Sequence, residues 1–291
     1  MKSLFRFPPL HPNIIGSFWM IGSVFCFLTS NLFVKATGTS LPTFQLVFMR
    51  GVFQSLILLP IVMHKGFAVM KSKHIGNYAL RLGFGITNIV LMFYAVANLP
   101  FATATSLVFS RPLFTIVLAA VLLNERVGWK RGLATVLGFV GILLVLNPGP
   151  VGLTRAELAG VGASFSLAVT YIYIQKLSRT ENHVAMMMWF SVTATVTTAV
   201  PAYLQWETFD LKTLGCLFVI AATATLAQYC VIRAYQVGKI TVISPLEYLQ
   251  TPLSALAGFL FFAESTTLNF WAGTVIIIAT GFYIVRKKPG D

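Results

Sequence analysis

Charged side chains are scarce in this chain. They make up 10% of its 291 residues, and only 8 residues are Asp or Glu, whereas 57% are hydrophobic and the mean hydropathy is +0.81. A soluble domain carries roughly 25% charged residues, so these few cannot cover a soluble surface of this size. The shortage excludes a soluble enzyme domain and points to a chain embedded in a lipid bilayer.

Signals for metals, disulfides and nucleotides are also missing. The three cysteines (Cys26, Cys216 and Cys230) stand singly in apolar runs, without the spacing of a metal site or a disulfide framework. The four histidines lie in predicted loops or near the ends of apolar runs, and no Walker-type phosphate loop occurs. We therefore predict no cofactor, no metal and no direct use of ATP.

The net charge of +13 is compatible with nucleic acid or with a membrane. The lysines and arginines form no basic patch on a polar domain, so nucleic acid is not a predicted partner. Basic residues in short loops are what orients a protein in a bilayer. The lipid bilayer is therefore the predicted surrounding of this chain.

What the sequence has instead is long apolar runs. A helix of roughly 20 apolar residues crosses ~30 Å of hydrocarbon, and ten runs come close to that length. They cover residues 14–34, 43–63, 76–98, 101–123, 130–147, 156–176, 184–204, 212–235, 240–263 and 268–286. This predicts an all-α fold class, an integral membrane bundle of ten transmembrane helices. The first run is long for a signal peptide, so we expect it to be retained as a span.

The basic residues divide unequally between the two sets of connections that alternate along such a chain. If the N-terminus is cytoplasmic, the inner segments hold fourteen lysines and arginines and the outer segments hold three. Because cytoplasmic loops carry the excess of Lys and Arg, both termini are predicted to be cytoplasmic, in a multi-pass protein of a bacterial inner membrane.

One stretch of sequence occurs twice. The first copy has Pro112, an apolar run and Glu125, with 13 residues from proline to glutamate. The second has Pro252, an apolar run and Glu264, with 12 residues from proline to glutamate. Each copy is typical of a proline-bearing helix, a tight polar turn and a closing helix. The repetition predicts a duplicated membrane protein.

Five spans in each half is an odd number, so the second half enters the membrane from the opposite side. The predicted domains are 14–147 and 156–286, two five-helix repeats of inverted topology. Two such halves can open a central site first to one side and then to the other, as in many secondary carriers.

The repeats carry motifs that are similar to those of a known family. Residues 27–35 and 48–50, together with the paired stretches 112–125 and 252–264, resemble the EamA-type carriers of the drug/metabolite transporter superfamily. The resemblance covers about 14–286. It implies a secondary-active transporter, with a central cavity lined by spans one, three, four, six, eight and nine.

The resemblance leaves the substrate open. Members of the family import S-adenosylmethionine, riboflavin and similar solutes, or export amino acids, drugs and metabolites. Residues 103–105 and 109–115 are similar to the S-adenosylmethionine carrier branch, while Phe27 departs from the family, in which a tryptophan is common there.

Glu247 is the acidic residue that stands deepest in an apolar run, about a third of the way into span nine. A charged side chain at the bilayer centre costs ~2.5–3.5 kcal/mol on insertion scales unless it is paired or hydrated, so Glu247 is predicted to face the bundle interior. Two roles stay open. It is either a cation or proton site, since burial favours the uncharged form of a carboxyl, or half of a structural ion pair with Arg111, Arg50 or Arg233.

Three residues share the Glu247 side of span nine at helical spacing and complete its predicted site: Ser244, Tyr248 and Thr251. Pro245 and Pro252 lie in the same span, and a proline cannot donate to the carbonyl four residues before it. The freed carbonyls of Thr241 and Tyr248 need protein, water or a ligand inside a membrane. Span nine is therefore predicted to be a broken helix at the site, with a simple kink that holds a water as the alternative.

Arg111 lies near the middle of span four, beside Pro112, which frees the carbonyl of Val108. A guanidinium at this depth could clamp a carboxylate or phosphate of a substrate. It could equally neutralise Glu247 from the symmetry-related helix, and both interpretations stay open.

Three more arginines lie within spans. Arg50 is interpreted as structural, whereas Arg81 and Arg233 stand near predicted cytoplasmic ends and are expected to extend to the lipid headgroups. None of the three is part of the predicted site.

Polar and aromatic residues on the other inferred lining spans complete the predicted substrate site. Any one of them could instead make a helix–helix hydrogen bond. The set is Asn31 in span one, Asn88 and Tyr94 in span three, Tyr171 in span six, and Gln228 and Tyr229 in span eight. Together they predict a moderately polar cavity with aromatic walls, suited to an amphipathic small molecule.

Glu125 and Glu264 follow the ends of spans four and nine, on opposite faces of the membrane. We interpret both as helix caps. A contact that gates the cavity is the alternative.

Transport by a secondary carrier, coupled to protons or to a counter-substrate, is the predicted function. The rivals are an integral-membrane enzyme that acts on a lipid-linked substrate and a channel. An enzyme needs clustered acids or histidines, whereas Glu247 stands alone, and a static pore has no need of inverted halves with mid-span prolines. A small-molecule substrate is the predicted partner, and a homodimer is an open expectation.

Overall fold

The computed structural model describes residues 12–72, 74–122, 129–147, 153–177, 180–237 and 244–286. Within these ranges every regular element is a helix, and no strand occurs. The all-α fold class predicted from the apolar runs is confirmed.

The helices of the first half follow the predicted runs. They are α1 (Pro12–Thr37), α2 (Thr43–Lys65), η1 (Phe67–Met70), α3 (Ile75–Asn98), α4 (Phe101–Leu107), η2 (Val108–Ser110), α5 (Arg111–Leu122) and α6 (Trp129–Leu146). The fourth run is the exception, because a short 3-10 helix, η2, separates α4 from α5.

The second half repeats this order. Its helices are α7 (Arg155–Leu177), α8 (His183–Leu204), α9 (Leu211–Val237), η3 (Ser244–Leu249), α11 (Gln250–Phe262) and α12 (Leu268–Arg286). Here the ninth run is divided, since the 3-10 helix η3 precedes α11. The divided runs are therefore the fourth member of each half.

Six of the described helices are long and apolar enough to cross a membrane, by length and composition. They are Ile14–Thr37, Thr43–Lys65, Ile75–Asn98, Arg155–Ile174, His183–Leu204 and Leu211–Ala234. Helices α6 and α12 supply shorter apolar stretches, Gly132–Leu146 and Leu268–Tyr283. Together with the two divided runs, these helices make a two-repeat helical membrane bundle.

Prolines and short polar side chains set the helix boundaries. Pro42 and Pro100 stand directly before α2 and α4, where a missing N–H costs little. Thr154 and Glu157 form a capping box at the start of α7, in which the Thr154 N–H donates to Glu157 Oε2 at 2.6 Å. Asn147, which follows α6, has a φ of 45°, a left-handed conformation that stops a helix.

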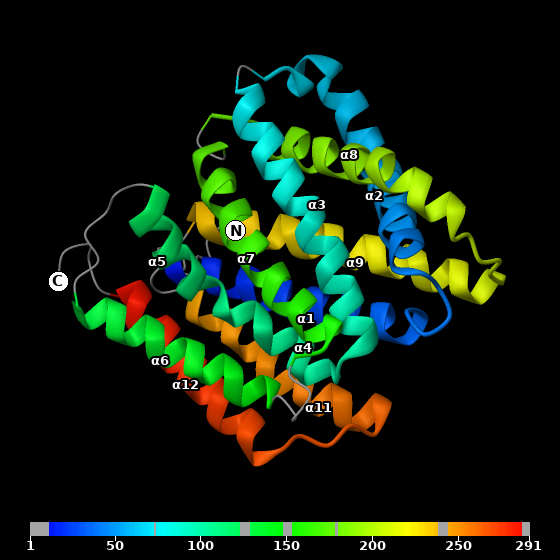
Figure 1. Cartoon of the computed structure of the whole chain (residues 1–291). Helices are drawn as coiled ribbons and strands as arrows, with labels where there is room; N and C mark the ends of the chain where they lie inside the picture. The colour runs from blue at the N-terminus through cyan, green and yellow to red at the C-terminus, as the bar shows by residue number, and fades with distance from the viewer. Residues whose placement is uncertain are drawn as a thin grey trace, which may run out of the picture.

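The most extensive helix contacts join one half of the chain to the other. Helix α1 packs along α9, α3 along α7, α2 along α8, and α6 along α12, while α4 packs against α11. Figure 1 shows α2 and α8 together at one edge of the bundle, and α6 and α12 together at the opposite edge.

The four most extensive of these pairs are unchanged when the two halves are exchanged. Replacing each helix by its counterpart turns the α1–α9 pair into the α7–α3 pair, and it maps the α2–α8 and α6–α12 pairs onto themselves. A twofold relation between the halves would give this set of contacts.

Glycine lets α6 and α12 approach backbone to backbone. A Cβ added to Gly273 would lie 2.5 Å from the carbonyl oxygen of Gly141 and 2.7 Å from the Val145 nitrogen. No side chain fits in that space, so the pair packs in the way of small-residue membrane interfaces.

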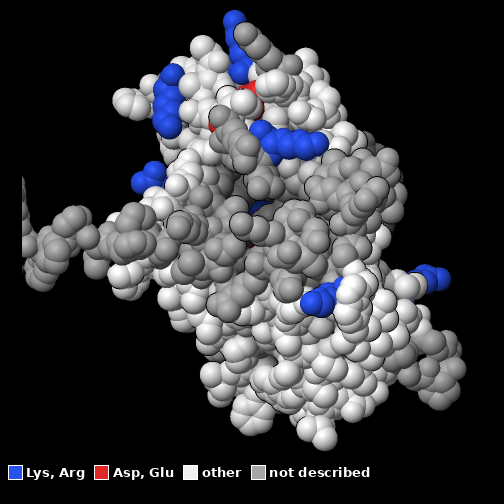
Figure 2. Space-filling view, turned by 90° about the vertical axis from the view of Figure 1, so that its left-hand side faces the viewer, with Lys and Arg blue, Asp and Glu red and all other residues white. Residues whose placement is uncertain are grey.

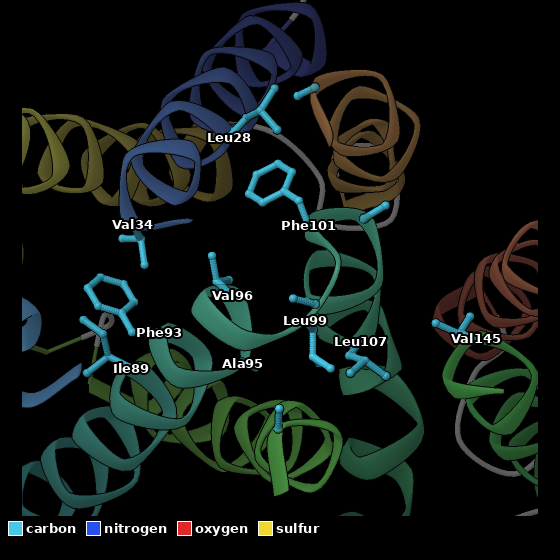
Figure 3. Close-up of a cluster of buried hydrophobic side chains, with 14 of the residues drawn as sticks. Leu28, Val34, Ile89, Phe93, Ala95, Val96, Leu99, Phe101, Leu107 and Val145 are labelled. Carbon is cyan, nitrogen blue, oxygen red and sulfur yellow. The ribbon is translucent and has the colours of Figure 1, made fainter. Parts of the chain in front are cut away.

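The largest apolar core includes residues where α1, α3 and α4 meet (Figure 3). Phe101, the first residue of α4, is fully buried. Its ring lies between Leu28 of α1 and the end of α11 (Figure 3), where it also contacts the ring of Phe262 at 6.0 Å between centroids. Apolar side chains thus fill the bundle at this end.

The prediction that Arg81 extends to the lipid headgroups is wrong, while the interpretation of Arg50 as structural and the expectation for Arg233 stay predictions. Arg81 is 2% exposed, and its Nη1 donates to the Met186 carbonyl at 2.7 Å, because α3 packs close to the start of α8 and turns the side chain inward. The guanidinium carbon of Arg50 lies 5.9 Å and 5.8 Å from the ring centroids of Phe93 and Phe190, which suits a structural role. Arg233 is exposed.

Candidate substrate site

The break in span four lies where Pro112 predicts it. The proline ring excludes the preceding turn from regular α-helical bonding, and residues 108–110 form η2. The carbonyl of Val108 accepts instead from the Arg111 N–H and from the Ser164 hydroxyl of α7, at 3.5 Å from Ser164 Oγ.

Ser164 also contacts Ser110, the last residue of η2. Its Oγ lies 2.7 Å from Ser110 Oγ, and both residues are fully buried. The carbonyl freed by the proline is therefore satisfied by protein, and α7 fixes the point at which span four bends.

The break in span nine places Glu247 in a 3-10 turn. Helix η3 covers Ser244 to Leu249, directly before the Gln250-Thr251-Pro252 stretch that opens α11. The predicted free carbonyl of Thr241 and the side chains of Ser244 and Pro245 lie outside the described part of the chain. What the structure does show is that both divided spans bring their breaks to the same part of the bundle.

Arg111 and Glu247 form an ion pair across these two breaks. Arg111 Nη2 donates to Glu247 Oε2 at 3.0 Å, and the side chains are 15% and 16% exposed. Tyr171 of α7 completes the group, since the guanidinium carbon lies 4.1 Å from the centroid of its ring. Of the three arginines considered for Glu247, the structure selects Arg111.

The charges of this pair are matched, and neither side chain is fully buried. Each group neutralises the other, which lowers the cost of holding two charges within a membrane bundle. Figure 2 shows basic side chains at the surface of one face of the molecule and a further blue Lys or Arg side chain deeper, near the middle of that face.

Three other predicted site residues have structural or peripheral contacts. Asn88 donates to the carbonyl of Ala163 at 2.8 Å and so joins α3 to α7. The Gln228 amide oxygen accepts from Gln54 at 3.2 Å, which joins α9 to α2. Tyr229 is 43% exposed and meets the ring of Trp19 edge-on at 5.9 Å.

The remaining predicted residues lie in or beside the apolar core. Asn31 is buried on α1 and has no hydrogen bond to a described residue. Tyr94 packs against the main apolar cluster, as does Tyr248, which follows Glu247 directly. Thr251 is fully buried, and its hydroxyl has no hydrogen-bond partner among the described residues.

One polar contact between the divided spans was not predicted. Thr105 Oγ1 of α4 donates to Ser254 Oγ of α11 at 2.7 Å, and both residues are buried. Ser254 lies three residues after Thr251, so the helical spacing used for Glu247 and Thr251 could have included it.

The predicted capping role of Glu264 is confirmed, although the helix that it caps, α4, belongs to the other half. Its Oε2 accepts from the Phe101 N–H at 2.5 Å, at the start of α4, and its Oε1 lies 2.7 Å from Lys35 Nζ. Sequence reasoning missed Lys35 as the partner of Glu264. Glu125 lies outside the described residues.

Comparison with known proteins finds transporters over most of the chain. The EamA-like transporter family matches residues 14–147 and again 154–286. The S-adenosylmethionine uptake transporter of Rickettsia bellii is 31% identical over 94% of this chain and 94% of its own length. The riboflavin transporter of Brucella anthropi is 26% identical, over 87% of this chain and 92% of its own length.

Two further matches bear on direction and on fold. The pseudopaline exporter of Pseudomonas aeruginosa is 27% identical over 91% of this chain and 94% of its own length. One solved crystal structure superposes with a TM-score of 0.64 over 91% of this chain and 94% of the other, at 14% sequence identity. That likeness concerns the fold alone.

Proposed function

Since the chain belongs to the EamA-like transporter family, we propose that it is a secondary carrier that moves a small amphipathic metabolite across the membrane by alternating access. The observation that carries this proposal is the Arg111–Glu247 ion pair, at 3.0 Å. Its two partners come from the breaks of spans four and nine, one in each half. Any movement of one half against the other changes their separation, so binding at the pair is coupled to that movement.

S-adenosylmethionine is the first substrate to test. Similar proteins are named as its uptake transporters, and the chemistry of the pair is compatible with it. A carboxylate of the solute can replace Glu247 beside Arg111, a cationic group can replace Arg111 beside Glu247, and a flat ring system can stack on an aromatic wall such as Tyr171. Riboflavin-like and amino-acid-like solutes are the next candidates, and uptake is the proposed direction.

Counterflow in proteoliposomes tests the proposal. Vesicles loaded with unlabelled S-adenosylmethionine should accumulate the labelled compound transiently, and faster than empty vesicles, because a carrier exchanges one molecule for another. A channel gives no such acceleration, and an enzyme gives a chemically changed product. Accumulation that loaded riboflavin or tryptophan drives equally well would instead indicate a carrier of broad specificity.

Glu247 is proposed to take part in coupling as well as in binding. A Glu247→Gln substitution keeps the shape and removes the charge, so we expect slower transport or a changed dependence of transport on pH. Wild-type uptake with an unaltered pH profile would remove Glu247 from the mechanism.

A double variant separates binding from structural pairing. Removing one partner of a buried pair leaves an uncompensated charge, whereas removing both does not. If the pair is only structural, Arg111→Gln combined with Glu247→Gln should transport like the wild type. We expect the double variant to stay inactive while its thermal stability recovers above that of either single variant.

The proposed orientation has both termini in the cytoplasm, with two repeats of opposite topology, 14–147 and 156–286. The excess of basic residues in one set of connections supports it. Impermeant labels on the two chain ends of right-side-out vesicles should both fail to react. We also propose a homodimer, and mass measurement of the purified protein in detergent tests it.

A further inference from the structure

One end of the bundle carries an ion pair that joins three elements. Lys35 lies near the end of α1, and Glu264 follows α11; their Nζ and Oε1 atoms are 2.7 Å apart. Lys35 also donates to the Leu99 carbonyl, just before α4, and lies 5.7 Å above the centroid of the Phe262 ring. Glu264 accepts from the Phe101 N–H, so spans one, four and nine meet at this pair.

Local backbone geometry directs the Glu264 carboxylate to this position. Ala263 ends α11 in the left-handed region, with a φ of 52°, which a non-glycine residue adopts only at a cost. The turn lets the Glu264 N–H bond the Gly258 carbonyl at 3.1 Å. A Cβ on Gly258 would lie 3.0 Å from Glu264 Oε2, so the glycine leaves room for the carboxylate against the helix.

An apolar layer lies next to the ion pair. Phe101 and Leu107 are fully buried, and Leu28 and Leu99 are nearly so. Figure 3 shows the Phe101 ring between Leu28 and the end of α11. Water and charged solutes therefore cannot pass between α1, α4 and α11 at this end.

The substrate site lies deeper along the same span. Arg111 is ten residues after Phe101, which is roughly 15 Å along a helix. That is about half of the ~30 Å thickness of the hydrocarbon. The Arg111–Glu247 site thus lies about half of that thickness away from the end of the bundle where α1, α4 and α11 meet.

We propose that the Lys35–Glu264 pair and the Phe101 layer form the gate that closes one access path to the Arg111–Glu247 site. This inference rests on the proposed carrier function. To open that path, the end of α1 must separate from the end of α11, which breaks the ion pair and releases the Phe101 N–H. When the two ends meet again, the opposite charges close the path and α4 regains its cap.

Two other contacts connect spans without joining the three elements of the gate. Gln45 makes a two-way contact with the backbone of Glu207, at 2.8 Å and 3.1 Å, between α2 and the segment before α9. Asn269 donates to Asn147 at 3.1 Å, between α12 and the end of α6. Neither contact includes α1, α4 or α11, so neither is expected to open with the gate.

Thiol labelling measures whether the pair holds this end closed. In a protein with Cys26, Cys216 and Cys230 replaced by alanine, Leu28→Cys places a reporter behind the ion pair. An impermeant maleimide is applied to each face of the membrane in separate samples, without substrate. With both gate residues intact we expect slow labelling. Lys35→Ala or Glu264→Gln should speed labelling from the gate side about tenfold, which corresponds to a loss of about 1.4 kcal/mol in the free energy that favours the closed gate.

The choice of variants separates the gate from the cap. Glu264→Gln keeps an acceptor for the Phe101 N–H and loses only the charge, so a cap alone predicts no change in labelling. Asn269→Ala, at a contact outside the gate, is the matched control and should leave labelling slow. Unchanged labelling in both Lys35→Ala and Glu264→Gln would overturn the proposal.

Reversible cross-linking supplies a measurement that does not depend on the stability of a variant. Lys35→Cys combined with Glu264→Cys, joined by a short disulfide-forming cross-linker that spans the removed side chains, should lose transport and regain it on reduction. Transport at the same rate before and after reduction would mean that this end need not open. If labelling behaves as expected but no solute shows counterflow, the proposed function fails while the gate stands.

Discussion

The Arg111 guanidinium has an ionic partner and an aromatic one. Glu247 Oε2 lies 3.0 Å from Nη2, and the ring centroid of Tyr171 lies 4.1 Å from the guanidinium carbon. A planar, weakly hydrated cation can satisfy both at once, whereas a lysine ammonium is a compact point charge. The identity of the cation therefore matters here as well as its charge.

We predict that Arg111→Lys lowers the rate of uptake at low substrate concentration by about tenfold, since a desolvated guanidinium–aromatic contact is worth about 2 kcal/mol or somewhat less. Initial rates in proteoliposomes measure this effect. Arg50→Lys is the matched control, because Arg50 lies between Phe93 and Phe190 and outside the site. The control should lower thermal stability with little change in the apparent affinity for substrate.

Asp210 gives a residue-scale prediction about acid sensitivity. It precedes α9, and hydrogen bonds from the Thr213 side chain and from the Thr213 N–H, at 2.9 Å, hold the pKa of its carboxyl below the ordinary value. The folded state thus favours the charged form, so this cap contributes above the ordinary pKa of about 4 and is lost as the pH falls through the lowered pKa.

Asp210→Ala should therefore speed amide exchange in the first turn of α9 at pH 6. The difference from the wild type should shrink as the pH is lowered below about 4. Asp210→Asn keeps an acceptor oxygen and cannot ionise, so its exchange should show no acid-dependent step at this turn. A constant difference between Asp210→Ala and the wild type at every pH would contradict the cap.

Sequence reasoning reached Glu247 and Arg111 because a charge inside an apolar run needs a partner. It left the partner open, since only the packing of the two halves decides which arginine is near. It also assigned Asn88 and Gln228 to the site. Their amides instead meet a carbonyl of α7 and the Gln54 side chain, contacts that depend on the rotation of neighbouring helices.

Among the helices, the divided spans were the most predictable. Proline chemistry located both breaks, because the missing N–H and the ring clash act within one turn of the proline. The sequence could not show that Ser164 of another helix would satisfy the freed Val108 carbonyl. Local rules therefore predicted where each span breaks, and tertiary packing determines what holds the break in place.

The α6–α12 pair gives an element-scale prediction. Gly273→Ala would put a Cβ 2.5 Å from the backbone oxygen of Gly141, so the helices must move apart. We expect a loss of roughly 1–3 kcal/mol of stability, as for other overpacked interiors, measured as a lower midpoint of thermal unfolding in detergent.

Gly215→Ala is the matched control for this change. Gly215 lies in α9, and a Cβ built there meets no atom within 4 Å. Alanine has a higher helix propensity than glycine, so this variant should unfold at the same temperature as the wild type or slightly higher. A Gly273→Ala protein as stable as Gly215→Ala would show that the α6–α12 contact is looser than the structure indicates.

The whole molecule is held together mainly across its two halves. The α1–α9, α3–α7, α2–α8 and α6–α12 contacts are the most extensive, and each joins one half to the other. Helices within a half contact each other far less. A repeat detected in the sequence is therefore not, in this protein, an independently packed domain, although its five runs were predicted correctly from hydropathy.

This packing predicts the behaviour of the separated halves. Residues 1–147 or 148–291 expressed alone should fail to form a stable species, because each half then exposes to lipid the helix faces that the other half covers, together with buried polar side chains such as Ser164 and Gln54. Co-expressed, the two pieces should assemble and transport, since the cut falls between the two predicted repeats, 14–147 and 156–286. A full-length chain with a protease site inserted there and cut after assembly is the control, and it should retain transport.

A single half that purifies as one species and unfolds cooperatively would contradict the prediction, because its stability would then come from contacts within the repeat.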